Sequence, residues 1–414
     1  MKRLLKSTNF ILNHYMFKDC AGIFLIQLAL LITGLIFGII LARSLSMNDM
    51  GYYQLILSYM AIGQILAIPG MNEIISKGVL RDYDPIYFAV LKRSLCTTII
   101  SALVIFLICG ILYFQQKGSI CLALLIVGTF LPVMGMEKHG SFLKGKRKFL
   151  LSRRIIFFTS ILNLIIVGGT AYFTKSIISM FIALFITRVA VLTICLKIVT
   201  RLIIKKNIDN KLEGDLLKQG WQLSILNVFN LIVGQIDRII IGVIDPSLLA
   251  IYHIGCLLPR KIKDNVKTIL VVPMTHWAKL SKKEHFYKIK KHGYKFFLLG
   301  TILTISIWIL SPYIIPFFYG NNYYESVQIS RLISLTLPCL FIGTIILDMD
   351  IYHGDTSYYQ KVVIITQISS LVLLCITIPQ FGIYGVIISF VVRAYIQHLI
   401  FPLYYLVKSR GQTR

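Results

Sequence analysis

The sequence alternates between long apolar runs and short polar stretches from one end to the other. Runs of about 20 apolar residues are long enough to cross the hydrocarbon core of a bilayer as α-helices. We locate about twelve such runs, at residues 19–42, 52–76, 94–114, 119–136, 155–173, 176–199, 221–244, 248–277, 296–318, 327–346, 362–378 and 383–405. The pattern therefore predicts an all-α membrane protein with about twelve transmembrane helices.

The basic residues between these runs give the chain an orientation. Most of the 43 Lys and Arg residues lie at the termini and in the loops that follow the even-numbered spans. The loops on the other side carry only Arg43, Lys117 and Lys175. Since positively charged loops face the cytoplasm, we expect the N- and C-termini to be cytoplasmic. The opposite loops are short, so we expect the function to reside within the helices.

The composition agrees with a membrane location and argues against other classes. The 414 residues are 57% hydrophobic and 14% charged, and the mean hydropathy is +0.77. A soluble domain carries roughly 25% charged residues. The net charge of +26 is spread over short loops, so it does not form the basic domain expected of a nucleic-acid-binding protein.

The eight cysteines and eight histidines offer no recognisable metal site. The cysteines are scattered through apolar runs without a C-x-x-C motif. We interpret them as small buried apolar side chains that form neither disulfides nor metal sites. No two histidines have metal-ligand spacing. We therefore expect no catalytic residue, no metal and no cofactor.

The two halves of the chain resemble each other. The stretch RSLSMNDMGYY (Arg43–Tyr53) aligns without gaps with GVIDPSLLAIY (Gly242–Tyr252). An even number of spans separates them, so the repeat is parallel, and parallel repeats of six helices are a transporter architecture with the substrate site between the halves. We expect an N-terminal bundle at 1–205, a cytoplasmic linker at 206–219 and a C-terminal bundle at 220–414.

Polar side chains interrupt the span at 221–244. Asn227, Asn230, Asp237 and Arg238 lie on or beside one helical stripe within an otherwise apolar run. A lipid-facing helix has no reason to keep such a stripe, so we expect it to face a cavity or another helix. For Asn227 and Asn230, hydrogen bonding between packed helices is an equally weighted alternative.

The span at 248–277 carries the densest positive charge. Arg260, Lys263 and Lys267 share one helical face, with Arg260 past the bilayer midplane at a rise of 1.5 Å per residue. We interpret this face as the basic lining of a water-filled cavity. The alternative is that the span ends near Leu258 and these residues open a cytoplasmic loop. The apolar stretch TILVVPM that follows favours a continuing helix.

Three further spans each contribute one arginine, namely Arg188, Arg331 and Arg393. Each could also pair structurally or extend to the interface. Asp237 is the one acid that we expect clearly at membrane depth, so positive charge is in excess there. A cavity rich in Arg and Lys favours an anionic substrate over a cationic drug, which would require carboxylates. We expect Asp237, Arg238 and Arg43 to act in charge pairing or gating, with the partner of Asp237 on the first span, on 248–277 or at Arg238.

The stretch GSFLKGKR (Gly140–Arg147), in the predicted cytoplasmic loop 137–154, almost fits the P-loop pattern. Arg147 occupies the position of the magnesium ligand, and an apolar helix precedes the stretch where a P-loop requires a strand. We therefore interpret it as a basic anchor for anionic lipid headgroups and not as a nucleotide site.

A resemblance to a known family lies in three stretches: FGIILARSLSMNDMGYYQLILSY, QIDRIIIGVIDPSLLAIYHIG and PQFGIYGVIIS. These resemble the Wzx-type oligosaccharide flippases of the multidrug/oligosaccharidyl-lipid/polysaccharide exporter superfamily, and the resemblance covers essentially the whole chain. It implies two six-helix bundles in a V around a central cavity, with alternating access.

The resemblance also implies a function. Such flippases move undecaprenyl-pyrophosphate-linked oligosaccharide repeat units from the cytoplasmic to the periplasmic leaflet of the bacterial inner membrane, for O-antigen or capsule assembly. The expected partners are this glycan, membrane lipids, and the polymerase and chain-length regulator of the pathway, with the protein itself a monomer. Arg260, Lys263, Lys267, Arg188, Arg331 and Arg393, with Asn227 and Asn230, are the expected substrate contacts.

Two alternatives remain. One is a multidrug or cation antiporter of the same superfamily, against which the excess of basic residues argues. The other is a membrane-embedded polysaccharide polymerase, which would need a sizeable outer loop with catalytic side chains. The predicted outer loops are too short to supply one.

Overall fold

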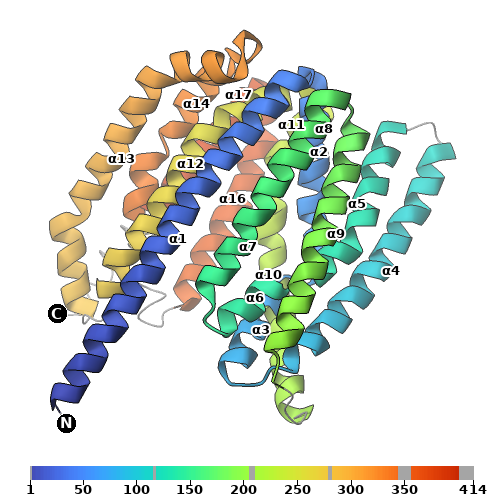
Figure 1. Ribbon diagram of the computed structural model, residues 1–414. Coiled ribbons are helices and arrows are strands. Elements are labelled where there is room, and N and C mark those ends of the chain that lie inside the picture. Colours follow the sequence, from blue (N-terminus) through green and yellow to red (C-terminus); the bar gives the residue numbers. More distant parts are fainter. Residues whose placement is uncertain (1, 115–117, 205–209, 278–281, 344–355, 401–414) are drawn as a thin grey trace. The chain divides into compact units, whose positions relative to one another are not determined.

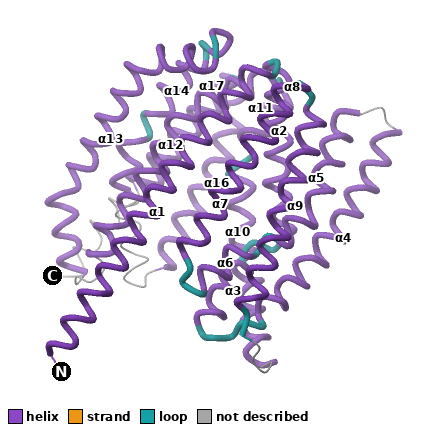
Figure 2. Tube along the Cα trace, viewed as in Figure 1, coloured by secondary structure: helices purple, strands orange, loops and turns teal. Residues whose placement is uncertain are grey.

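The computed structural model describes residues 2–114, 118–204, 210–277, 282–343 and 356–400. Across these ranges the regular structure is helical, as predicted, and contains no strand (Figure 1, Figure 2). Helices satisfy their own backbone hydrogen bonds, which an apolar solvent requires. The named helices are α1 Lys2–Ser44, α2 Met47–Gly63, α3 Met71–Leu80, α4 Ile86–Phe114, α5 Gly118–Met136, α6 His139–Gly145, α7 Phe149–Leu162, α8 Gly168–Thr174, α9 Ile177–Leu202, α10 Asn210–Val233, α11 Ile236–Ile244, α12 Pro246–Trp277, α13 Lys282–Tyr319, α14 Ser326–Ser334, α16 Thr356–Phe381 and α17 Ile383–Tyr395.

The chain is a multi-pass membrane protein. Among the described residues, nine helices are long and apolar enough to cross a membrane, and a bent pair raises the number to ten. That pair joins Met47–Ala67 to Met71–Leu80 at an angle of 52°. The expected count of about twelve and the cytoplasmic termini stay predictions.

The helices form two compact units. Unit 1 contains Met1–Ser46 and Ile56–Gln235, and unit 2 contains Met47–Leu55 and Ile236–Arg414. All of α10 therefore groups with the N-terminal helices, and the first residues of α2 group with the C-terminal ones. The predicted division into bundles at 1–205 and 220–414 stays a prediction about the repeat.

The core of unit 1 forms where α3, α4, α6 and α10 meet. The rings of Tyr87 and Phe142 are fully buried and lie edge to face, with centroids 5.3 Å apart. Leu216 and Leu217 of α10 pack into the same core. Residues 210–219, which the sequence predicted as part of a linker, are therefore helical because they bury leucine side chains.

A buried ion pair ties three chain segments together at this end of unit 1. Asp84 precedes α4, and its side chain is 1% exposed. Its Oδ2 lies 2.7 Å from Lys146 Nζ, in the turn after α6. The same oxygen accepts a hydrogen bond of 2.9 Å from the backbone N–H of Ile204, just after α9.

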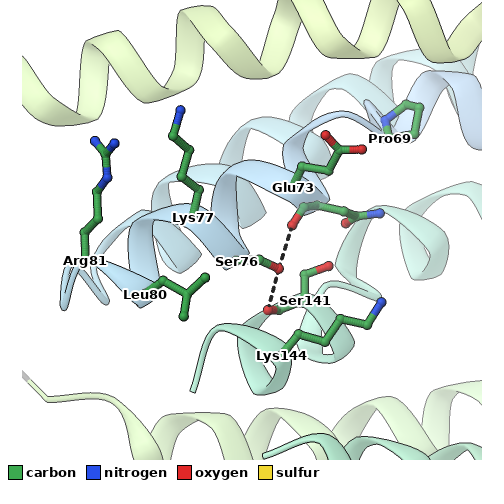
Figure 3. A pocket seen from close by; sticks show the side chains of 9 residues that line it. Pro69, Glu73, Ser76, Lys77, Leu80, Arg81, Ser141 and Lys144 are labelled. Atoms are coloured by element: carbon green, nitrogen blue, oxygen red, sulfur yellow. Dashed lines mark hydrogen bonds between the residues drawn. The ribbon is translucent and has the colours of Figure 1, made fainter. Parts of the chain in front are cut away.

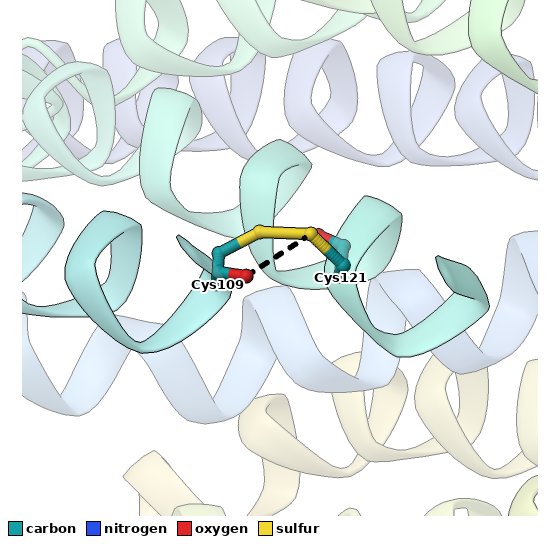
Figure 4. Close-up of a disulfide and its surroundings, with 2 residues drawn as sticks. All are labelled: Cys109 and Cys121. Atoms are coloured by element: carbon teal, nitrogen blue, oxygen red, sulfur yellow. Dashed lines mark hydrogen bonds between the residues drawn. A yellow bond between two sulfur atoms is a disulfide. The ribbon is translucent and has the colours of Figure 1, made fainter. Parts of the chain in front are cut away.

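A disulfide joins α4 and α5 near their connection (Figure 4). It pairs Cys109 with Cys121, 12 residues apart, in the antiparallel hairpin of the two helices. The expectation that the cysteines form no disulfide is therefore wrong, because the hairpin brings together two residues that no local motif connects. Cys96 and Cys375 are exposed, whereas Cys195, Cys256 and Cys339 are buried as expected.

The first turns of α2 and α12 meet in unit 2. Asp245 caps α12 by accepting a hydrogen bond of 2.8 Å from the backbone N–H of Ser247, and Pro246 occupies the first helical position. A Cβ at Gly51 in α2 would overlap the carbonyl group of Pro246, so this contact requires glycine. Met47 and Pro246, the first residues of the two helices, lie 199 positions apart, the offset of the predicted repeat.

Candidate functional site

Asp237 lies just after a break in the span predicted at 221–244. The helix stops at Val233 and resumes at Ile236, with a turn at 234–235. Asp237 is therefore in the first turn of α11, where the positive end of the helix dipole stabilises a carboxylate. Its burial, at 9% exposed, means that it needs partners within the protein.

Tyr252 and Arg260 of α12 supply these partners. The buried Tyr252 hydroxyl donates a hydrogen bond of 2.7 Å to Asp237 Oδ2. An Arg260 guanidinium nitrogen lies 3.6 Å from the same oxygen. The guanidinium carbon of Arg260 also lies 5.9 Å from the centre of the Tyr252 ring, within cation–π range. The three side chains form one connected cluster in unit 2.

Arg393 of α17 adds a second guanidinium to this cluster. The negative charge of Asp237 acts on it, and its guanidinium carbon lies 5.2 Å from the centre of the Phe390 ring. Lys263, one turn beyond Arg260 on α12, is half-buried. The carboxylate of Asp237 thus lies within ion-pair distance of Arg260 and acts electrostatically on Arg393, so positive charge is in excess around it.

The helix that carries this charge continues well past the cluster. α12 extends to Trp277, so the chain does not leave the helix near Leu258. The side chains of Lys267 and Asn230 lie outside the described residues. Arg238, also predicted here, follows Asp237 on α11, and its charge acts on the His253 side chain.

Arg188 pairs with an acid within unit 1. It lies on α9 in unit 1, 3.4 Å from a carboxylate oxygen of Glu137, and its guanidinium carbon is 5.8 Å from the centre of the Phe130 ring. Glu137 was predicted to lie in a loop, and it does lie in the short non-helical break between α5 and α6. A second arginine–carboxylate pair is therefore present in unit 1.

Arg331 satisfies a backbone carbonyl of a neighbouring helix. Pro312 in α13 has no N–H, so the carbonyl of Trp308 loses its partner within the helix. Two guanidinium nitrogens of Arg331 lie 3.2 and 3.0 Å from that oxygen, and the Trp308 indole N–H donates to the carbonyl of Arg331 at 3.0 Å. This arrangement gives Arg331 a structural role in joining α13 to α14.

The remaining predicted residues lie in unit 1. Asn227 is half-buried on α10, and Arg43 is exposed at the end of α1. Ser224, on the same polar stripe as Asn227, is buried and accepts a hydrogen bond of 3.0 Å from the backbone N–H of Gly70. For Ser224, hydrogen bonding between packed helices is therefore the arrangement observed.

Sequence reasoning missed Lys138. Its side chain was predicted in a loop, yet it is 2% exposed and donates a hydrogen bond of 2.7 Å to the carbonyl of Ala67. Ala67 ends the first half of the bent span, where the helix leaves carbonyls without partners. Ser94 donates to the same oxygen at 2.8 Å. The sequence did offer one indication of this packing. A partly buried arginine such as Arg188 needs an acidic partner, and that partner is Glu137, which directly precedes Lys138.

The described residues contain no group of three or more His, Cys, Asp and Glu side chains that could hold a metal ion. The chemistry available to the unit 2 cluster is electrostatic: a positively charged, partly buried surface that can contact an anion.

Comparison with known proteins gives a family for the chain and solved structures that share its fold. A family model described as polysaccharide biosynthesis protein matches residues 17–255. No curated protein matches the chain significantly in sequence.

Several solved structures share the fold. Lipid II flippase MurJ, in an inward closed conformation, aligns with a TM-score of 0.64 and 16% identity, over 92% of this chain and 87% of that chain. An inward-facing multidrug resistance MATE family transporter of the MOP superfamily aligns with a TM-score of 0.67 and 13% identity, over 94% of this chain and 100% of that chain. A MOP superfamily transporter from Pyrococcus furiosus aligns with a TM-score of 0.55 and 13% identity, over 96% of each chain. At such identities the likeness shows the fold alone, which this chain shares with these transporters.

Proposed function

Because the chain belongs to the polysaccharide biosynthesis protein family, we propose that it is a flippase for undecaprenyl-pyrophosphate-linked oligosaccharide repeat units. It moves them from the cytoplasmic to the periplasmic leaflet of a bacterial inner membrane by alternating access. The units serve O-antigen or capsular polysaccharide assembly. The protein acts as a monomer, with both termini in the cytoplasm, beside the polymerase and chain-length regulator of the pathway.

The observation that carries this proposal is the excess positive charge around Asp237. The two positive charges of Arg260 and Arg393 outnumber the one negative charge of Asp237, which acts on both. A pyrophosphate bears about two negative charges, and burying these unpaired would cost many kcal/mol. Two guanidinium groups offset that cost and match phosphate oxygens in geometry. The Arg260 guanidinium retains N–H donors beyond those directed at Asp237.

The membrane potential supplies direction. Moving about two negative charges outward across an inside-negative membrane releases about 4–5 kcal/mol per 100 mV. The anionic substrate therefore moves downhill in the proposed direction without ATP. A cationic substrate would move against the same field and would need a coupled ion.

The alternative of a multidrug antiporter receives less support from this site. The fold does not separate the two functions, because MATE transporters and MurJ align about equally well. The charges do. A cation requires an available carboxylate, whereas Asp237 is engaged by Tyr252 and Arg260.

The test is complementation of cells that lack their own repeat-unit flippase. Expression of this chain should restore surface polysaccharide, and the variant Arg260→Glu should abolish it at equal abundance in the membrane. Since flippases can be selective for their sugars, the host should carry the glycan genes that neighbour this gene. Full surface polysaccharide in the Arg260→Glu cells would contradict the proposal.

A further inference from the structure

A pocket of about 730 Å³, lined mainly by polar and charged residues, lies in unit 1 (Figure 3). One face of α3 and one side of α6 line it. α3 is amphipathic: its opposite face, which includes Met71, Ile74 and Ile75, is buried in the core of unit 1. The polar face is therefore fixed in position by the packing of the apolar one.

The walls of the pocket are held together by direct contacts between α3 and α6. The Ser76 hydroxyl donates a hydrogen bond of 2.9 Å to the carbonyl of Ser141. A Cβ at Gly145 would lie 2.7 Å from Val79 and 3.0 Å from the carbonyl of Ser76, so the two helices approach closely. The pocket is thus a built feature and not a gap between mobile side chains.

The pocket carries excess positive charge. Lys77 and Arg81 extend from α3 toward the same side, and Lys144 extends from α6 (Figure 3). Glu73 is the one carboxylate in the lining. In the part of the chain that the structure describes, none of the three cations lies within ion-pair distance of a carboxylate. Lys77 instead donates a hydrogen bond of 2.6 Å to the neutral Gln219 side chain.

The pocket also contains two side chains with hydrogen-bond acceptors, Asn72 and the exposed Glu73. The side-chain oxygen of Asn72 is buried and has no hydrogen-bond partner among the described residues. The carboxylate of Glu73 is a second acceptor. An inorganic anion would satisfy the cations but not these two groups, because it brings few or no hydroxyl donors. The volume, moreover, is that of a pocket for a molecule larger than a phosphate ion.

We propose that this pocket binds a phosphate group that carries a hydroxyl-rich substituent. Lys77, Arg81 and Lys144 contact the phosphate oxygens, while Asn72 and Glu73 accept hydrogen bonds from the hydroxyl groups. This chemistry has two sources at a membrane surface: the glycerol phosphate headgroup of phosphatidylglycerol, or the glycosyl diphosphate of a lipid-linked sugar. The second source rests on the proposed function, and the first does not.

The pocket also gives a role to the stretch GSFLKGKR. Ser141 and Lys144 come from it, and the loop 137–154 is predicted to face the cytoplasm. We therefore propose that this basic stretch contacts a headgroup at this pocket, which it lines together with α3.

The experiment measures binding to the purified full-length protein in detergent by native mass spectrometry. The probes are phosphatidylglycerol, polyprenyl diphospho-N-acetylglucosamine, and phosphatidylethanolamine as a phospholipid without the hydroxyl-rich group. The test variant is Arg81→Gln with Lys144→Gln. The matched control is Arg147→Gln with Lys148→Gln, which removes the same charge from exposed neighbours that do not line the pocket.

We expect the test variant to lose about tenfold or more in affinity for at least one of the two hydroxyl-rich probes, since charge-assisted hydrogen bonds to phosphate are strong. The control variant should change by less than about threefold. Loss confined to phosphatidylglycerol identifies a bilayer lipid as the ligand, and loss confined to the glycosyl diphosphate identifies the carrier. Glu73→Gln should weaken the same probe while leaving phosphatidylethanolamine unaffected.

Equal losses in the test and control variants would overturn the proposal, because they would mean unspecific attraction to basic residues. Undiminished binding of both hydroxyl-rich probes by the test variant would also overturn it. The outcome is separable from the proposed function: a protein that binds phosphatidylglycerol here but restores no polysaccharide would refute the flippase and leave the pocket intact. The substituted residues are exposed, and equal thermal unfolding midpoints would verify that both variants fold.

Discussion

Replacing Arg260 with Gln, alone and together with a change at Asp237, separates two roles that its guanidinium could have. It lies 3.6 Å from Asp237, so its function could be to neutralise that carboxylate. Alternatively, it contacts the pyrophosphate of the substrate. The single variant removes both interactions and should therefore lose transport on either account. A second change at Asp237 distinguishes the two.

The structure sets the magnitudes. At 3.6 Å and an effective dielectric constant of about 20, the attraction between Asp237 and Arg260 is about 4–5 kcal/mol before desolvation. Leaving one member of a buried pair alone typically costs about 3–5 kcal/mol. A charge-assisted hydrogen bond to the substrate is worth about 1.5–3 kcal/mol, which corresponds to about 10- to 150-fold in rate or affinity.

The decisive variant combines Asp237→Asn with Arg260→Gln. It removes both charges, so no buried carboxylate is left without a partner, and Tyr252 can still hydrogen-bond to the Asn side chain. If Arg260 contacts the substrate, the double variant should regain stability but stay at least about tenfold below wild type in transport. Asp237→Asn alone should transport well, because both arginines remain.

The assay is the initial rate at which surface polysaccharide appears after induced expression in flippase-deficient cells, normalised to the amount of protein in the membrane. The thermal unfolding midpoint of each purified variant reports stability separately. Wild-type transport by the double variant would refute the reasoning, because Arg260 would then serve only to neutralise Asp237.

Three further predictions concern the framework. Asp84→Ala leaves Lys146 without its buried partner and should lower the unfolding free energy by about 3–5 kcal/mol, read as a lower midpoint in thermal denaturation of the purified protein. Asp245→Ala removes the cap of α12 and should cost about 1 kcal/mol by the same assay. Hydrogen bonds from Ser247 lower the pKa of Asp245 in the folded protein. The stability that ionised Asp245 contributes is therefore fully present above its unfolded-state pKa and is lost as the pH falls through its folded-state pKa. The alanine variant should lack this acid-dependent loss of stability. Arg331→Met leaves the carbonyl of Trp308 unsatisfied and should reduce stability, whereas Arg331→Lys, which keeps one donor, should retain part of it; equal midpoints for the two variants would contradict this.

The helices could be predicted from the sequence because their signal is local. A run of about 20 apolar residues specifies a spanning helix whatever its neighbours are. The start of α12 also has a local signal in the sequence, because Asp245 is a capping residue and Pro246 is a favoured first helical residue. The two aligned stretches of the repeat contain the starts of α2 and α12 at equivalent positions.

The breaks within spans could not be predicted, because they depend on residues far away in the sequence. The bend near Ala67 is completed by Lys138, which supplies the donor that the helix end lacks. Arg331 was predicted as a substrate contact from its position in a span. Its contact with the Trp308 carbonyl depends on Pro312, on another helix, which leaves that carbonyl without a helical partner. The pairing of Cys109 with Cys121 depends on the geometry of a hairpin.

The candidate site was predictable in part. The excess of basic residues over Asp237 can be counted in the sequence, and the proximity of Arg260 follows from two consecutive helices. Sequence could not separate Arg260 and Arg393, which lie near Asp237, from Arg188, which pairs with Glu137 in unit 1. That distinction requires tertiary structure, because these five basic and acidic residues come from different helices or from a position predicted as loop.

The most direct test of the central claim uses proteoliposomes that contain this protein alone. A fluorescent undecaprenyl-pyrophosphate-linked repeat unit is placed in both leaflets, and an impermeant glycosidase added outside reports how much of it becomes accessible. We predict that the accessible fraction rises from about half toward completion with wild-type protein, and faster when a potential draws the anion outward. Vesicles with Arg260→Gln should stay near half. A wild-type protein that leaves the inner pool protected, with the potential applied and the substrate matched to the gene neighbourhood, would contradict the account.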